Sequence, residues 1–225
     1  MGRKTRARAP EKKEAQYQII IETAKEMYKK SDFQTISMNS IAKRLNMEQS
    51  NLYNYFKSKR ELWIAVRSSY REEHDKIIES IIENHNGTNL ELIYKLATAM
   101  IDKMGSDFSM FLFLFVAMIP PSKSSGPIEE SYDFKHGFFH FRDIIEVAID
   151  DGELKVDDID LFTYQLWSMI FGEIKAETHL KFKAKVIDPI NNGDKKLIPR
   201  ENYRTYALKT IKDFLFKNAT YKPSF

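Results

Sequence analysis

The sequence contains no cysteine and few of the residues that interrupt helices. Its 225 residues include 8 Gly and 7 Pro but 16 Phe. The absence of cysteine excludes disulfides, thiolate zinc sites and cysteine nucleophiles. The scarcity of Gly and Pro favours long helices over a turn-rich β fold. Because 43% of the residues are apolar, the chain can bury a sizeable core, and we expect an all-α protein.

Long apolar segments are missing as well. The longest apolar run, residues 108–119, contains a serine and is too short to span a bilayer. The charged N-terminal residues carry no apolar stretch typical of a secretory signal. The sequence has neither a Gly-rich phosphate loop nor a G-x-S-x-G nucleophile turn. These features predict a cytoplasmic protein with no membrane partner, no cofactor and no enzymatic activity.

Charge is unevenly distributed along the chain. Residues 1–60 contain 14 Lys or Arg against 6 Asp or Glu, whereas residues 61–225 contain 21 against 26. A basic end on an acidic body is typical of proteins that bind a polyanion through that end. A solvated basic tail is the alternative, and charge by itself does not separate the two.

The spacing of apolar residues predicts a succession of helices. Residues 1–13 are polar, contain Pro10 and are expected to form a flexible arm. Helices follow at about 14–30, 38–45 and 49–56, and a capping box of Ser58 and Glu61 opens a long helix that ends near residue 84. The remaining helices are expected at about 89–104, 107–118, 128–150, 157–184 and 201–217, with a loop over 188–199. This pattern divides the chain into the arm 1–13, a three-helix domain 14–60 and a helical body 61–225.

A three-residue turn separates the second and third predicted helices, which is the arrangement of a helix-turn-helix. Asn46 is expected to end the earlier helix because Asn tolerates the left-handed conformation. The next helix begins with Gln49, Ser50 and Asn51, whose short polar side chains are suited to base edges in the major groove. Groups suited to phosphate oxygens follow them: Tyr53, Tyr55, Lys57 and Lys59.

Residues 20–66 resemble the DNA-binding domain of TetR-family transcriptional regulators. The matching segments are IIETAKEMY (20–28), TISMNSIAKRLNMEQSNLYNYF (35–56) and KSKRELWIAV (57–66). The resemblance implies double-stranded DNA as a partner and Gln49, Ser50 and Asn51 as its base contacts. It implies backbone contacts from Ser37, Tyr53, Tyr55, Lys57 and Lys59. The alternative to a solvated basic tail is an arm, residues 1–13, that follows the minor groove of DNA with Arg3, Lys4, Arg6 and Arg8.

The sequence departs from the family pattern at three positions. Asp32 replaces a usual Gly, Asn46 replaces the Gly of the turn, and Glu48 stands where a helix-capping Ser or Thr is usual. Glu is a poorer cap than Ser or Thr, although its charge suits the start of a helix. We expect Glu48 to affect the docking of the recognition helix and not the fold.

Beyond residue 66 the resemblance is looser and rests on residues 152–154 (G-E-L) and 170–172. It implies a larger helical ligand-binding and dimerisation domain, joined by a long helix to the helix-turn-helix. Two-fold symmetry in a homodimer would place the two recognition helices about 34 Å apart, one turn of DNA. The residues expected at the dimer interface are Leu161, Ile170, Ile174, Leu208, Ile211 and Leu215.

The resemblance also implies a cavity for a small-molecule effector. The residues expected to line it are Phe108, Phe111, Phe115, Met118, Phe134, Phe138, Phe141, Tyr164 and Trp167. Residues of this kind are more often core, but as a lining they would favour an apolar or flat ligand, such as an acyl chain or an aromatic compound. His136 and His140 lie one helical turn apart without the H-E-x-x-H pattern, so we expect no metal site.

The sequence therefore predicts a sequence-specific transcription regulator, a repressor that its effector releases from a palindromic operator. Two alternatives remain. One is a DNA-binding protein of the nucleoid or accessory type without an effector, and the other is a helical enzyme with a vestigial basic end.

Overall fold

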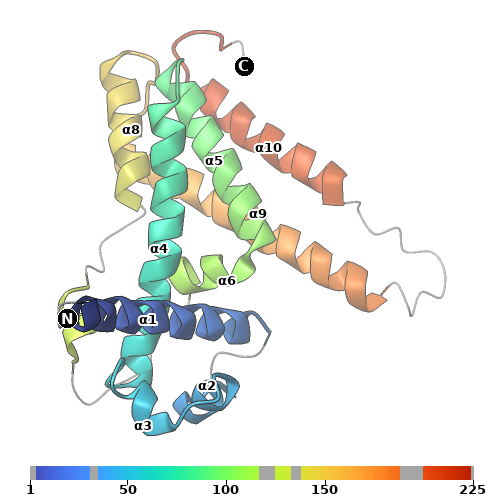
Figure 1. Cartoon of the computed structure of the whole chain (residues 1–225). Helices are drawn as coiled ribbons and strands as arrows, with labels where there is room; N and C mark the ends of the chain where they lie inside the picture. Colours follow the sequence, from blue (N-terminus) through green and yellow to red (C-terminus); the bar gives the residue numbers. More distant parts are fainter. Residues whose placement is uncertain (1–3, 31–34, 117–124, 133–137, 188–199, 224–225) are drawn as a thin grey trace. The chain divides into compact units, whose positions relative to one another are not determined.

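The computed structural model describes residues 4–30, 35–116, 125–132, 138–187 and 200–223. These residues form helices and one isolated bridge between Leu154 and Ala219, so the all-α prediction is confirmed (Figure 1). The helices are α1 (Lys4–Lys30), α2 (Met38–Arg44), α3 (Gln49–Leu52), α4 (Lys59–Glu83), α5 (Asn89–Ser106), α6 (Phe108–Phe111), the π-helical turn η2 (Leu112–Val116), α7 (Pro127–Glu130), α8 (Phe138–Asp150), α9 (Ile159–Ile187) and α10 (Arg200–Lys217).

The chain forms two compact units. Unit 1 comprises residues 1–75 and 109–133, and unit 2 comprises residues 76–108 and 134–225. The chain passes from one unit to the other within α4. Unit 1 thus contains the predicted three-helix domain together with a segment that is distant in sequence, and the boundary predicted at residue 60 divides α4 near its start.

Helix α1 begins at Lys4 and not at Glu14, so most of the segment predicted to be a flexible arm belongs to a helix. Arg, Ala, Lys and Glu fill this segment, and all four are strong helix formers. The helix continues through Pro10, which removes one backbone hydrogen bond. Arg3 lies outside the described residues, and no side-chain position is described for Lys4, Arg6 or Arg8.

An aromatic core fixes α1 against the first part of α4 in unit 1. Phe113, in η2, is the centre of this core. Its ring centroid lies 5.1 Å from that of Tyr28, 5.4 Å from that of Trp63 and 5.5 Å from that of Tyr70. These rings are large and buried, so they contribute much apolar burial to the packing of α1, α4 and η2. The sequence predicted an unbroken helix at 107–118, whereas the structure changes to a π-helical turn at Leu112.

Four helices, α5, α8, α9 and α10, pack against one another in unit 2 (Figure 1). Each contributes side chains that are fully buried in the interior: Leu90 and Ile93 from α5, Ile145 and Ala148 from α8, Leu166, Ile170 and Ile174 from α9, and Ile211 and Leu215 from α10. The bounds of these helices lie within a few residues of the predicted ones, except that the predicted helix 128–150 is represented by α7 and α8.

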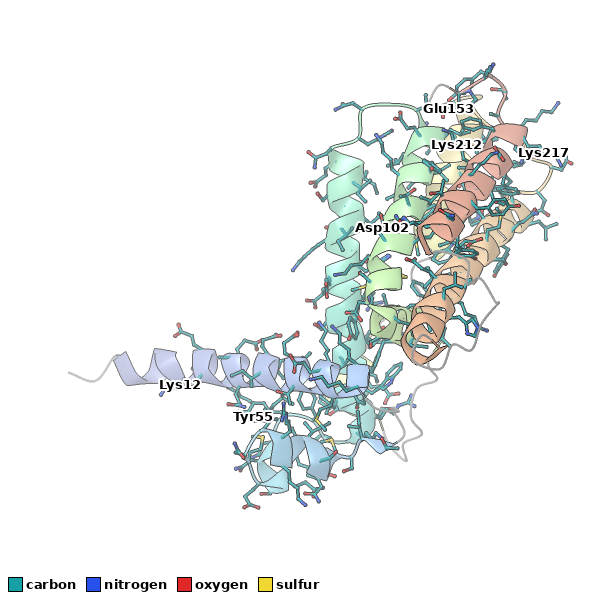
Figure 2. The ribbon with its side chains drawn as sticks, turned by 90° about the vertical axis from the view of Figure 1, so that its right-hand side faces the viewer. Lys12, Tyr55, Asp102, Glu153, Lys212 and Lys217 are labelled. Carbon is teal, nitrogen blue, oxygen red and sulfur yellow. The ribbon has the colours of Figure 1, made fainter. Side chains whose placement is uncertain are left out.

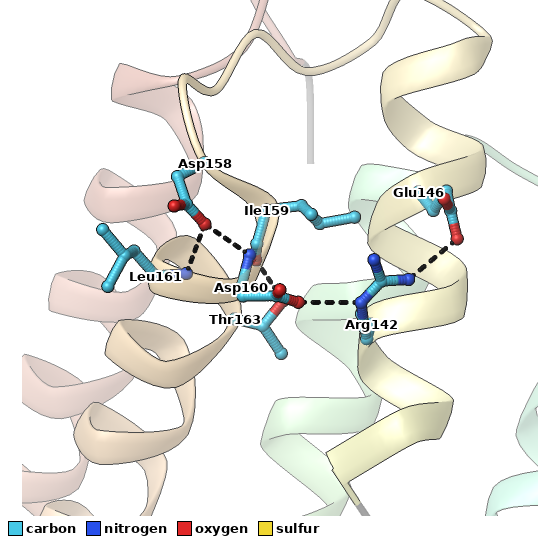
Figure 3. Close-up of polar contacts among 7 residues, drawn as sticks. All are labelled: Arg142, Glu146, Asp158, Ile159, Asp160, Leu161 and Thr163. Carbon is cyan, nitrogen blue, oxygen red and sulfur yellow. Dashed lines mark hydrogen bonds and ion pairs between the residues drawn. The ribbon is translucent and has the colours of Figure 1, made fainter.

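Asp158 caps α9, one of the two candidates that the sequence offered with Asp157. Its Oδ1 accepts hydrogen bonds from the backbone N–H of Asp160 at 2.9 Å and of Leu161 at 3.0 Å (Figure 3). Arg142, in α8, donates to Asp160 at 2.8 Å and to Glu146 at 3.0 Å. These contacts fix where α9 begins and connect that point to α8.

The G-E-L segment at 152–154 has a physical role at each position. Gly152 has a φ of 71°, a left-handed conformation that Gly adopts without strain. Glu153, which is labelled in Figure 2, accepts hydrogen bonds at the start of α5 from the backbone N–H of Asn89 at 3.1 Å and of Leu90 at 2.9 Å. Leu154 is buried with 2% of its surface exposed. The segment therefore turns the chain, caps one helix and fills the core.

Candidate nucleic-acid interface

The predicted helix-turn-helix is present as α2 and α3. Ser37 caps α2: its Oγ accepts from the backbone N–H of Ser40 at 3.1 Å, and the Oγ of Ser40 accepts from the N–H of Ser37 at 2.9 Å. This reciprocal pair is a capping box in which Ser40 replaces the usual Glu or Gln as the second member, so the usual sequence pattern does not reveal it. Ser37 remains exposed.

The turn between the two helices follows the expectation for Asn46, whose φ is 52°. The N–H of Met47 bonds the carbonyl of Ala42 at 3.0 Å, and the N–H of Asn46 bonds the carbonyl of Lys43 at 3.2 Å. This pair of bonds is a Schellman motif, which satisfies the last carbonyls of α2 and reverses the chain direction. The departure from the usual Gly is thus accommodated by a left-handed Asn.

Helix α3 presents the three predicted base-contacting residues at its start. Ser50 and Asn51 are exposed, and Gln49 is half-buried, with its Nε2 3.4 Å from the hydroxyl of Tyr53. Glu48, at the N-cap, makes no side-chain cap hydrogen bond, as expected for a poor capping residue. The polar edge therefore faces away from the core while Leu52, which is fully buried, anchors the other side.

The regular helix ends at Leu52, earlier than the predicted residue 56. The chain continues to wind through tighter bonds, from the N–H of Asn54 to the carbonyl of Asn51 at 3.1 Å and from Tyr55 to Leu52 at 3.0 Å. Phe56 closes this stretch with a fully buried ring that stacks on Tyr17 at 5.0 Å between centroids. Burial, followed by the charge of Glu14, raises the pKa of Tyr17.

The residues predicted to contact phosphates lie before and after α3 in the sequence, and their exposure differs. Tyr53 is 40% exposed and Lys57 is exposed, whereas Tyr55 and Lys59 are half-buried. Tyr55 lies below α1 in Figure 2 and lines a surface hollow of unit 1 with Asn54. Hydroxyl and ammonium groups at these positions suit contacts with a nucleic-acid backbone.

Glu61 has one of the contacts predicted for a capping box with Ser58 and two contacts that were not predicted. The hydroxyl of Ser58 accepts from the N–H of Glu61 at 3.1 Å, which is one half of the predicted capping box. The carboxylate does not return to Ser58 but accepts from the N–H of Lys57 at 2.7 Å and from the N–H of Ile128 at 3.0 Å. The second donor is far away in sequence, so local patterns do not reveal it.

The residues predicted to line an effector cavity are divided between the two units and differ in exposure: Phe111, Phe141 and Trp167 are buried, and Phe115 is half-buried. In unit 1 the rings of Phe111 and Phe115 lie 6.1 Å apart, and in unit 2 those of Phe141 and Trp167 lie 5.5 Å apart. Tyr164 departs from the prediction, because 60% of its surface is exposed on α9. Phe108 is half-buried, Met118 and Phe134 lie outside the described residues, and no side-chain position is described for Phe138.

The predicted dimer interface needs correction. Ile170, Ile174, Ile211 and Leu215 are each 0% exposed in the single chain, because α9 and α10 pack on each other and on α5. They are core residues of unit 2 and are not available to a partner chain. Leu208 is half-buried, and of the predicted set only Leu161 is well exposed, at 69%.

The described part of the chain contains no group of three or more His, Asp or Glu placed to hold a metal ion. His136 lies outside the described residues, and no side-chain position is described for His140. Within the same described ranges, none of the helices combines the length and apolarity needed to cross a membrane.

Comparison with known proteins gives a match over the helix-turn-helix and a shared fold over most of the chain. The family model for bacterial regulatory proteins of the tetR family matches residues 20–66. A solved TetR transcription regulator from Haloarcula marismortui is similar with a TM-score of 0.61 at 15% identity, over 92% of this chain and 100% of that chain.

Two further solved structures are similar at the level of the fold. AibR, in complex with isovaleryl coenzyme A and operator DNA, has a TM-score of 0.59 at 16% identity, over 86% of this chain and 96% of that one. The ketosteroid transcriptional regulator KstR2 of Mycobacterium tuberculosis has a TM-score of 0.54 at 14% identity, over 92% of this chain and 96% of that one. No curated protein matches the sequence.

Proposed function

We propose, from the match of residues 20–66 to the tetR family of bacterial regulatory proteins, that the chain is a member of that family. We propose further that it is a ligand-responsive transcription repressor acting as a homodimer on a palindromic operator. The observation that carries the proposal is the polar edge of α3. Ser50 and Asn51 are exposed beside Gln49, on a helix whose opposite side is anchored by the fully buried Leu52. Such an edge suits base contacts in the major groove.

The proposed phosphate contacts come from both sides of this edge. Ser37 at the start of α2 and Lys57 before α4 are exposed, and Tyr53 and Lys59 complete the set with Tyr55. The minor-groove contacts of Arg3, Lys4, Arg6 and Arg8 stay a proposal, now with all but Arg3 in the first two turns of α1.

Selection of genomic DNA fragments with the purified protein tests the proposal and yields an operator. Asn51→Ala should then weaken operator binding by about 1–3 kcal/mol and relax one base position. Lys59→Ala should weaken binding to all sequences alike and reduce the dependence of affinity on salt. Asn86→Ala, the same substitution at an exposed Asn outside the helix-turn-helix, is the matched control.

The outcomes separate the proposed function from its alternatives. An equal loss on operator and random DNA for Asn51→Ala would contradict its role as a base contact. Broad coating of DNA without preferred sites would favour a nucleoid or accessory protein. No binding to any duplex would favour the helical enzyme.

We propose an apolar or flat effector, an acyl chain or an aromatic compound. Buried aromatic residues in both units support this class: Phe111 and Phe113 in unit 1, Phe141 and Trp167 in unit 2. Neighbours in fold point the same way, since AibR was solved with isovaleryl coenzyme A and KstR2 is a ketosteroid regulator. Release of operator DNA by a panel of acyl thioesters and sterols, with a short-chain polar acid as control, tests the class.

The proposed dimer face consists of the apolar side chains that unit 2 leaves exposed. Leu161 is 69% exposed, Tyr164 60% and Tyr206 70%. A second copy of the chain would cover them and set the distance between the two recognition helices. Leu161→Asp combined with Tyr206→Asp should shift the sedimentation of the protein toward the monomer, and an unchanged dimer would exclude this face.

A further inference from the structure

A segment far from the helix-turn-helix in sequence lies against the start of α4 within unit 1. We name residues 126–132, which include α7, the strap. Its contacts are polar and specific: the N–H of Ile128 donates to the carboxylate of Glu61 at 3.0 Å, and Arg60 makes a two-point ion pair with Glu129, with Nε 2.8 Å from Oε2. This hydrogen bond from Arg60 lowers the pKa of Glu129.

The carboxylate of Glu61 serves two chain segments at once. It is buried, with 1% of the residue exposed, and it accepts from the N–H of Lys57 at 2.7 Å as well as from Ile128. Gly126 is the N-cap residue of α7 and has no side chain, so Glu61 supplies the cap that α7 lacks. Charge-assisted hydrogen bonds of this kind are stronger than neutral ones, and a buried carboxylate that loses a donor is strongly disfavoured.

The close fit between Glu61 and Gly126 means that a larger residue at position 126 would have to displace the carboxylate of Glu61. A Cβ atom built at Gly126 would overlap both the carboxylate carbon and an oxygen of Glu61. The φ of Gly126 is −114°, which any residue adopts, so the requirement for Gly is one of space and not of backbone conformation. The next residues continue the contact, since Ile128 lines the same surface hollow as Tyr17 and Tyr55.

Glu61 also bonds to the turn that carries two of the proposed phosphate contacts. Its bond to the N–H of Lys57 sets the backbone of residues 57–59, which carry Lys57 and Lys59. We propose that the strap is a positioning element of the DNA-binding surface: docked on Glu61 and Arg60, it holds residues 57–59 where they grip the phosphates. This inference rests on the proposed function and adds a segment outside residues 20–66 to the machinery of DNA binding.

Gly126→Ala is the principal test, because the added methyl group displaces the carboxylate of Glu61 without removing any group of the DNA-binding surface. We expect the affinity for the operator to fall about tenfold, as for the loss of a charge-assisted hydrogen bond. Affinity for random duplex should fall in parallel and the salt slope should decrease, because phosphate contacts are affected and base contacts are not. Amide exchange at Lys57 and Ile128 should accelerate in the free protein.

Two further variants separate positioning from a general loss of structure. Glu129→Gln breaks the ion pair with Arg60 and should lower affinity in the same way, whereas Glu130→Gln, at the exposed neighbouring position, should not. Glu61→Ala together with Gly126→Ala should cost no more affinity than either single substitution, because both act through one contact. If Gly126→Ala does not fold, Glu129→Gln with its control still decides the question.

The results distinguish failure of this inference from failure of the proposed function. Wild-type protein that binds no duplex overturns the function, and with it the role of the strap. Wild-type protein that binds its operator, with Gly126→Ala and Glu129→Gln binding equally well at the same salt slope, overturns the strap alone. Unchanged exchange at Lys57 in Gly126→Ala overturns the strap independently of any DNA measurement.

Discussion

Removal of the Glu153 carboxylate should destabilise unit 2 more than any other single change to an exposed or half-buried carboxylate in its vicinity. The first four N–H groups of a helix have no partner within the helix. In α5 the Oγ1 of Thr88 satisfies Glu91, while Glu153 satisfies Asn89 and Leu90, the latter on a fully buried residue. Glu153→Ala leaves both amides without this acceptor.

The magnitude follows from two contributions. A hydrogen bond to a charged group contributes about 1.5–3 kcal/mol. The interaction of an anion with a helix N-terminus adds about 0.3–1 kcal/mol. Because water reaches the half-buried Glu153 and replaces part of what is lost, we expect a total near 2–3 kcal/mol, or a decrease in Tm of about 4–12 °C for a chain of this length.

Thermal unfolding followed by circular dichroism measures the effect, and Asp151→Ala is its control. Asp151 lies two residues away and is exposed, and its carboxylate accepts a hydrogen bond from the side chain of Asn89 at 2.9 Å. Its removal should change stability by less than about 0.5 kcal/mol. If Glu153→Ala were as stable as Asp151→Ala, the assignment of Glu153 as the cap of α5 would be wrong.

Three further predictions concern single positions. Asn46→Ala should lower the free energy of unfolding by about 1 kcal/mol in urea titration, because Ala adopts the left-handed conformation less readily than Asn. Asn46→Gly should be neutral or stabilising. The reverse order would contradict the left-handed conformation of residue 46. Asp158→Ala should lower the free energy of unfolding by about 1 kcal/mol in thermal melts. Asp160→Ala breaks an exposed ion pair and should lower it clearly less. Equal losses would argue against Asp158 as the cap of α9. Burial raises the pKa of Tyr28. Above a pH of about 10 its hydroxyl therefore ionises in the unfolded chain but not in the folded one, and the free energy of unfolding of the wild type should fall as the pH rises. Unfolding titrations of Tyr28→Phe should lack this part of the fall.

The helix-turn-helix could be predicted from the sequence because its determinants are local. The left-handed Asn46 and the alternation of polar residues with the apolar Leu52 and Phe56 lie within eleven consecutive positions, so the pattern can be read from one short stretch of sequence. The same holds for Asp158, whose capping role depends on amides two and three residues ahead. Patterns of short range therefore specify where these helices begin and end and which side chains point outward.

The features that could not be predicted depend on partners distant in sequence or on competing local preferences. The second donor to Glu61 is Ile128, 67 residues away, and no spacing rule joins them. The cap that Glu153 supplies to α5 reaches back to Leu90 across 63 residues. Pro10 suggested an irregular segment, whereas the helix-forming residues around it decide the outcome.

The error over the dimer interface has a different origin, which lies in α9 itself. Apolar side chains occur on more than one side of this helix: Ile170 and Ile174 are fully buried, while Leu161 and Tyr164 are 69% and 60% exposed. A helix that is apolar on several sides has no single face that its pattern can assign to the core. Ile170 and Ile174 lie in the interior of unit 2, whereas Leu161 and Tyr164 remain exposed. Exposed apolar side chains that adjoin one another are typical of surfaces that meet a partner, so the proposed dimer contact lies on the side of α9 that carries Leu161 and Tyr164 and not on the side of Ile170 and Ile174.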